Sequence, residues 1–187
     1  MPTLTDNTYR IFVDDKLDPE KLQQGIFLFL YRATRVPPHI GLIFNGKIYD
    51  ITLIGPTLGI DASDFINTIV KKYTKTLFIE LKTPNILENE TIDVLENEVK
   101  RFYKVTENNT CLSPIKTAFD KFYSLPTTEV QYIFDLIPLL EMKHLISNVF
   151  HLNMERNLTS NYAVLQRYNQ DVINQSITAL NRKNAIC

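Results

Sequence analysis

The sequence predicts an α+β fold in which a small antiparallel sheet comes first and helices follow. All five glycines lie between Gly25 and Gly59, so tight turns are expected early in the chain. Residues 25–31 form a continuous apolar run, which is typical of a strand buried on both faces. After residue 60 apolar side chains recur mostly at helical spacing. Together these three observations predict the fold class.

The stretch from His39 to Asp50 predicts a β-hairpin. Its centre is Asn45-Gly46, the dipeptide favoured in two-residue turns that need positive φ at both positions. Strand alternation then places His39, Gly41 and Asp50 on one face. Because Gly41 has no side chain, His39 and Asp50 are expected to lie within contact distance as diagonal neighbours.

The other elements follow from apolar spacing and from residues that start or end helices. Asp18 and Pro19 are typical of a cap and first position of a helical turn. Pro138 should kink or split the helix that contains it. We expect strands at 9–14, 25–31 and 76–81, and helices at 18–22, 62–72, 90–104, 114–123 and in two or three segments after 127.

A boundary is expected at Leu125-Pro126. It separates an α+β core at residues 1–125 from a helical extension at residues 126–187. The 187 residues suit one domain with an appendage, and the 44% hydrophobic content suffices for a core. The extension carries more apolar residues than one core of this size is expected to bury. We therefore expect self-association or a protein partner through residues 127–187.

The net charge and the N-terminal sequence limit the partners and the cellular location that we expect. The net charge of −1 argues against a nucleic-acid partner. The N-terminus shows no signal-peptide pattern, and the most apolar stretch, 132–152, is interrupted by charged residues and by Pro138. We expect no transmembrane segment and a cytoplasmic or virion-associated location. The two cysteines, Cys111 and Cys187, do not indicate a disulfide framework.

Cys111 is the candidate nucleophile. It lies just before Ser113-Pro114, where a helix is expected to begin, and a helix N-terminus favours the thiolate. Singly, Cys111, His39 and Asp50 suit ordinary structural roles: a small buried residue, a strand histidine and an exposed strand carboxylate. Their joint arrangement instead indicates a nucleophilic catalytic site.

No cofactor or metal site is predicted. His144 and His151 are seven residues apart and would share a helix face, but no further ligand occurs at metal-binding spacing. The sequence also lacks a P-loop, a Gly-x-Gly-x-x-Gly motif, a Cys-x-x-Cys motif and a Gly-x-Ser-x-Gly motif.

The apolar run at 25–31 followed by the His-x-Gly hairpin at 39–50 resembles the NlpC/P60 papain-like pattern. The histidine precedes the cysteine, an order similar to the circularly permuted branch with its YiiX-like and lecithin:retinol acyltransferase-like members. The resemblance implies a permuted papain-like core. It also implies that Cys111 is the nucleophile, His39 the general base and Asp50 the group that orients the imidazole.

The chain departs from the family pattern at several positions. Ile26 replaces the usual acidic residue after the first glycine, Cys111 is followed by Leu-Ser-Pro, and Asp50 stands where His, Glu or Asn is more usual. The resemblance implies a cysteine hydrolase or acyltransferase that acts on an amide, ester or thioester. Its substrate would be a peptidoglycan peptide, a lipid or a protein conjugate. The alternative is a catalytically inactive scaffold serving as a structural or virion assembly component.

Overall fold

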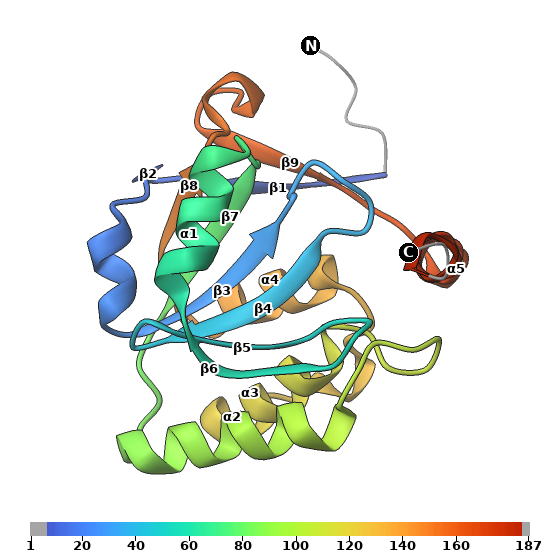
Figure 1. Ribbon diagram of the computed structural model, residues 1–187. Coiled ribbons are helices and arrows are strands. Elements are labelled where there is room, and N and C mark those ends of the chain that lie inside the picture. Colours follow the sequence, from blue (N-terminus) through green and yellow to red (C-terminus); the bar gives the residue numbers. More distant parts are fainter. Residues whose placement is uncertain (1–6, 185–187) are drawn as a thin grey trace.

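The computed structural model describes residues 7–184, which form a sheet covered by helices on both faces (Figure 1). The larger sheet has seven strands in the order β2-β8-β7-β3-β4-β5-β6, and a separate two-stranded sheet pairs β1 with β9. Among the strands of residues 7–184, β2 and β8 pair in parallel and the other neighbours are antiparallel. The strands are β1 (Thr8–Phe12), β2 (Asp15–Lys16), β3 (Ile26–Tyr31), β4 (His39–Phe44), β5 (Lys47–Ile51), β6 (Pro56–Asp61), β7 (Thr76–Leu81), β8 (Ile146–Leu152) and β9 (Tyr162–Gln166).

The two faces of the large sheet carry separate hydrophobic clusters. One face packs against α1, and the other packs against α2, α3 and α4 (Figure 1). Within β3, which lies between β4 and β7, the first five side chains are fully buried, as its apolar run predicts. The α-helices are α1 (Ala62–Lys71), α2 (Glu88–Phe102), α3 (Ser113–Tyr123), α4 (Ile133–Met142) and α5 (Gln170–Asn184), and 3-10 turns occupy Pro19–Gln23, Thr127–Glu129 and Glu155–Asn157.

Several expected elements are confirmed. Strand β7 has the predicted bounds, and the hairpin has the predicted register, with Phe44 opposite Lys47 and Leu42 opposite Tyr49. The turn at Pro19–Gln23 is capped by the side chain of Asp18, which accepts the backbone N–H of Glu20. These are cases where a local signal, either a turn dipeptide or a cap, determines the local structure.

The prediction that residues 126–187 form a helical extension is wrong for two segments. Residues 146–152 and 162–166 are strands β8 and β9, and β8 pairs with β7 in the main sheet. The predicted boundary at Leu125-Pro126 therefore falls inside one continuous sheet and core. A short apolar segment fits a strand or a helix equally well, and here the free edge of β7 decides in favour of a strand.

Two further expectations about this region need correction. Pro138 does not split its helix, since α4 continues through it from Ile133 to Met142. The apolar side chains used to predict self-association are largely buried in the chain's own core, so that reason for expecting an oligomer fails. The buried ones are Val130, Ile133, Phe134, Ile137, Leu140, Val149, Leu152, Leu165, Ile173 and Ile177, whereas Leu145, Val164, Tyr168, Val172 and Leu180 are not fully buried.

Strand β6 was not predicted from the sequence. It follows the turn at Gly55 and pairs with β5, with a register shift between Ile48 and Tyr49. Across residues 7–184, no helix combines the length and apolar character needed to traverse a lipid bilayer.

A buried carboxylate joins α2 to α3. Glu98 on α2 accepts hydrogen bonds from Lys121 on α3 at 2.5 Å and from Arg101 at 3.2 Å, and its side chain is only 3% exposed. Burial alone would raise the pKa of Glu98. The hydrogen bond from Lys121 and the charges of Lys121 and Arg101 outweigh burial, so the pKa lies below its ordinary value.

We expect Glu98→Gln to lower the free energy of unfolding by about 2 kcal/mol at neutral pH, because charge-assisted hydrogen bonds are lost in a buried position. Since the folded-state pKa of Glu98 is lowered, its contribution is present above the unfolded-state pKa and disappears as pH falls through the folded-state value. The difference in free energy of unfolding between wild type and Glu98→Gln should therefore become smaller as the pH falls. Urea unfolding over a pH series measures it.

The matched control is Glu96→Gln on the same helix, where Glu96 pairs with the exposed Lys100. Glu96→Gln should lower the free energy of unfolding by less than about 0.5 kcal/mol. Equal losses in the two variants, or a difference that does not depend on pH, would contradict the role given to Glu98.

Candidate active site

The hairpin brings His39 and Asp50 into direct contact. His39 begins β4 and Asp50 lies near the end of β5, and His39 Nε2 is 2.7 Å from Asp50 Oδ2. The His39 side chain is 29% exposed and that of Asp50 is 8% exposed. The carboxylate is thus the inner partner, and the imidazole lies between it and the surface.

Gly41 makes this contact possible. A Cβ at position 41 would lie 2.8 Å from the Cβ of Asp50 and 2.4 Å from the ring of Phe29, both closer than atoms can approach. The same Phe29 ring lies 5.9 Å from the His39 ring, centroid to centroid. A residue with a side chain at position 41 would therefore displace the support of the histidine and its carboxylate together.

Cys111 lies in a turn that leads into α3. The backbone N–H of Ser113 donates to the carbonyl of Thr110 at 2.9 Å, and the N–H of Thr110 donates to Ser113 Oγ at 3.0 Å. Within residues 7–184, the backbone N–H groups of Cys111 and Leu112 have no hydrogen-bond acceptor. The thiol therefore lies beside two available donors at a helix start.

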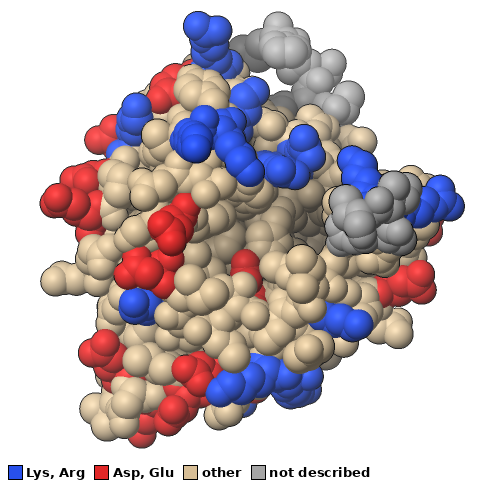
Figure 2. Space-filling model, viewed as in Figure 1, with Lys and Arg blue, Asp and Glu red and all other residues tan. Residues whose placement is uncertain are grey.

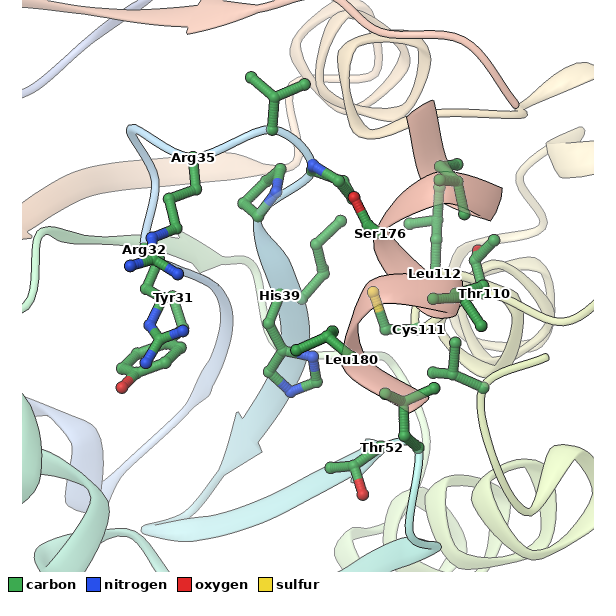
Figure 3. A pocket seen from close by; sticks show the side chains of 18 of the residues that line it. Tyr31, Arg32, Arg35, His39, Thr52, Thr110, Cys111, Leu112, Ser176 and Leu180 are labelled. Carbon is green, nitrogen blue, oxygen red and sulfur yellow. The ribbon is translucent and has the colours of Figure 1, made fainter. Parts of the chain in front are cut away.

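The structure brings Cys111 next to His39. Figure 3 shows the two side chains together in one pocket, His39 from β4 and Cys111 from the turn before α3. Burial alone would lower the pKa of His39. Hydrogen bonding to Asp50 and Cys111, with the charges of both groups, outweighs burial and raises the pKa to about 10. The surroundings of His39 therefore favour its protonated form.

The two ring nitrogens of His39 have different partners. Nε2 contacts Asp50, so Nδ1 is the nitrogen left for the thiol of Cys111. The second oxygen of Asp50, Oδ1, is buried and has no hydrogen-bond partner among the residues that the structure describes. The carboxylate is therefore held in place by its single contact with the imidazole and by packing.

A pocket of about 590 Å³ surrounds Cys111 and His39. Its walls come from the β3–β4 loop, the loop after β5, the segment before α3, and α5. Most of the lining is apolar, and α5 adds Ile173, Ser176, Ile177 and Leu180 to one wall (Figure 3). This wall is not predictable from the sequence, because nothing local to residues 170–184 indicates which surface the helix covers.

Comparisons of the chain with protein-family models, with curated proteins and with solved structures give no match. The chemistry of the site is therefore inferred from its own geometry.

The two other histidines do not form a metal site with one another. His144 lies in the turn after α4 and has positive φ, whereas His151 is a buried residue of β8, so they do not share a helix face as expected. Over residues 7–184, no three His, Cys, Asp or Glu side chains are placed to hold a metal ion.

Proposed function

We propose that this protein is a cysteine-dependent hydrolase or acyltransferase that acts on an amide, ester or thioester through Cys111, His39 and Asp50. The observation that carries the proposal is the 2.7 Å contact between His39 and Asp50, together with the placement of His39 and Cys111 in the lining of one pocket. A nucleophile, a base and a group that orients the base are the three parts that covalent acyl transfer requires.

The proposed reaction starts from a thiolate and an imidazolium. Because its surroundings raise the pKa of His39, the imidazole would carry a proton at neutral pH, and this charge would stabilise a neighbouring thiolate. Cys111 Sγ attacks the substrate carbonyl carbon and forms a C–S bond, while the carbonyl π electrons move to oxygen. The resulting oxyanion would be stabilised by the N–H groups of Cys111 and Leu112, which have no other acceptor among the described residues.

The tetrahedral intermediate then collapses. The bond to the leaving amine, alcohol or thiol breaks, and His39 Nδ1 donates its proton to that group. A thioester between the acyl group and Cys111 remains. Water or a second nucleophile then attacks this thioester and transfers a proton to His39, which restores the thiolate–imidazolium pair. Water gives hydrolysis, and an acceptor amine, alcohol or thiol gives acyl transfer.

We also propose that the fold is a permuted papain-like one. Three features support this relationship: the order His39, Asp50, Cys111 along the chain, the antiparallel β3–β4–β5 unit that carries the histidine, and the placement of the cysteine at the start of a helix.

The experiment is alkylation of Cys111 at neutral pH, in a Cys187→Ser background so that only one thiol can react. We expect iodoacetamide to modify the protein much faster than free cysteine at the same pH, since a thiolate reacts and a thiol does not. His39→Ala should slow the reaction by about tenfold or more, and Asp50→Asn should slow it less, because the base remains but loses its orientation. Intact mass spectrometry measures the rates.

Slow alkylation that does not respond to His39→Ala would overturn the proposal. It would favour the alternative of a non-catalytic scaffold in which Cys111 is an ordinary half-buried residue. The control is His144→Ala, which removes a histidine outside the pocket and should leave the rate unchanged.

A further inference from the structure

A second hollow adjoins the pocket around Cys111. It has a volume of about 270 Å³ and is lined by Arg32, Thr34 and Arg35 of the β3–β4 loop and by residues 72–75 of the α1–β7 connection. Arg32 and Arg35 line both this hollow and the larger pocket. The two cavities are therefore neighbours that share a wall.

Four cationic side chains surround this hollow, and we call them the cationic basin: Arg32, Arg35, Lys72 and Lys75. No acidic residue within 7–184 lines it. Among residues 7–184, none of the four pairs with a carboxylate. Figure 2 shows Lys and Arg gathered along the upper edge of the central hollow on this face. Four like charges grouped around one hollow create a local positive potential that attracts an anion.

The backbone holds the two halves of the basin together. The N–H of Ala33 donates to the carbonyl of Lys75 at 2.9 Å, and the N–H of Arg35 donates to the carbonyl of Arg32 at 2.8 Å. The Asn153 side chain donates to the carbonyl of Thr74 at 3.1 Å, which fixes the second loop to the end of β8. The backbone of the basin is thus held in place next to β4, the strand that carries His39.

Arg32 has an unusual backbone conformation. Its φ is 58°, in the left-handed region that a residue with a long side chain seldom adopts. The cost of such a conformation is of order 1–3 kcal/mol and is tolerated where the surrounding structure requires it, often at a ligand site. Here it turns the chain so that Arg32 and Arg35 both border the reaction pocket.

We propose that the cationic basin binds a phosphoryl group carried by the substrate while Cys111 attacks its carbonyl carbon; this inference rests on the function proposed above. In Figure 3, Arg32 and Arg35 lie on one side of His39, and Ser176 and Leu180 of α5 lie on the other. The substrate would extend from the basin past Cys111 to the apolar wall. Its class is an ester, thioester or amide with an apolar part and a phosphate-bearing part.

A phosphoryl group fits the basin better than a single carboxylate. Two guanidinium groups can each donate two parallel hydrogen bonds to a tetrahedral anion, and two ammonium groups add compact charge. A phosphate monoester carries between one and two negative charges near neutral pH and offers three acceptor oxygens, whereas a carboxylate carries one charge and two oxygens.

The test measures binding of inorganic pyrophosphate to full-length protein that carries Cys111→Ala, so that no turnover is involved. Arg35→Gln/Lys75→Gln removes two basin charges. Lys82→Gln/Lys143→Gln removes two exposed charges that line neither cavity. We expect the basin variant to weaken binding by about tenfold or more and the control variant by about twofold or less, because direct charge-assisted hydrogen bonds are lost only in the first. Titration calorimetry gives the dissociation constants.

Equal weakening by the two double variants, or no pyrophosphate binding in low salt, would overturn the basin as a phosphoryl site. Binding that depends on the basin supports it even if Cys111 proves unreactive in the alkylation experiment, so the two proposals fail separately. A second arm measures sedimentation with phosphatidylcholine vesicles that contain or lack phosphatidic acid. Basin-dependent sedimentation only with phosphatidic acid assigns the phosphoryl group to a lipid headgroup, and pyrophosphate binding without sedimentation assigns it to a soluble substrate.

Discussion

Replacing Cys111 with alanine is expected to reduce ester or thioester turnover by roughly 10⁴-fold or more, since loss of the nucleophile removes the covalent pathway altogether. The fold should be retained. The cysteine is only half-buried, and the packing at the start of α3 is carried by Leu112 and Ile115, which are 3% and 1% exposed. The free energy of unfolding should change by less than about 1 kcal/mol.

Turnover can be followed with p-nitrophenyl esters of increasing acyl length, and stability by urea unfolding of the same preparations. Cys187→Ala is the matched control for removal of a thiol and should leave turnover unchanged. Residual activity near that of wild type in Cys111→Ala would exclude the proposed nucleophile. Insolubility of the variant would show instead that the sulfur is a core packing element.

Replacing Gly41 with alanine is expected to impair stability and activity together. The new methyl group would overlap the ring of Phe29 and the Cβ of Asp50, so at least one of them must move. Overpacking of this kind costs about 1–3 kcal/mol. Displacement of Asp50 would also break its 2.7 Å contact with His39, and turnover should fall by roughly tenfold or more, as expected when the base loses its orientation.

Gly55→Ala is the control for the same chemical change. A Cβ at position 55 has no atom within 4 Å, and this glycine does not have positive φ, so the free energy of unfolding should change by less than about 0.5 kcal/mol. Urea unfolding and ester turnover of the two variants provide the comparison. A Gly41→Ala protein as stable and active as Gly55→Ala would show that the hairpin face tolerates a side chain between His39 and Asp50.

The parts of the site that were predictable from sequence are those fixed by local signals. The Asn45-Gly46 turn determines the hairpin register, and the register places His39 beside Asp50. Ser113-Pro114 locates the start of α3 and so the position of Cys111. The juxtaposition of Cys111 with the hairpin depended on the family resemblance, because the intervening residues contain no signal for that contact.

The features that sequence did not reveal depend on contacts between distant segments. Strand β8 forms because the edge of β7 is available about 70 residues earlier in the chain, and α5 contributes to the pocket because its apolar side covers residues far away in sequence. The cationic basin likewise combines two loops separated by a strand hairpin, β6 and α1, and no charge run marks it.

The position of β8 inside the sheet also limits how much of the sheet can form while the chain is being synthesised. Strand β8 lies between β7 and β2, so it supplies hydrogen-bond partners to two strands translated well before it. Until the ribosome has released residue 152, β7 has an open edge and apolar residues such as Phe78 lack their partners. Exposed strand edges of this kind promote aggregation. The nascent chain therefore exposes this edge from the synthesis of β7 until β8 has been made.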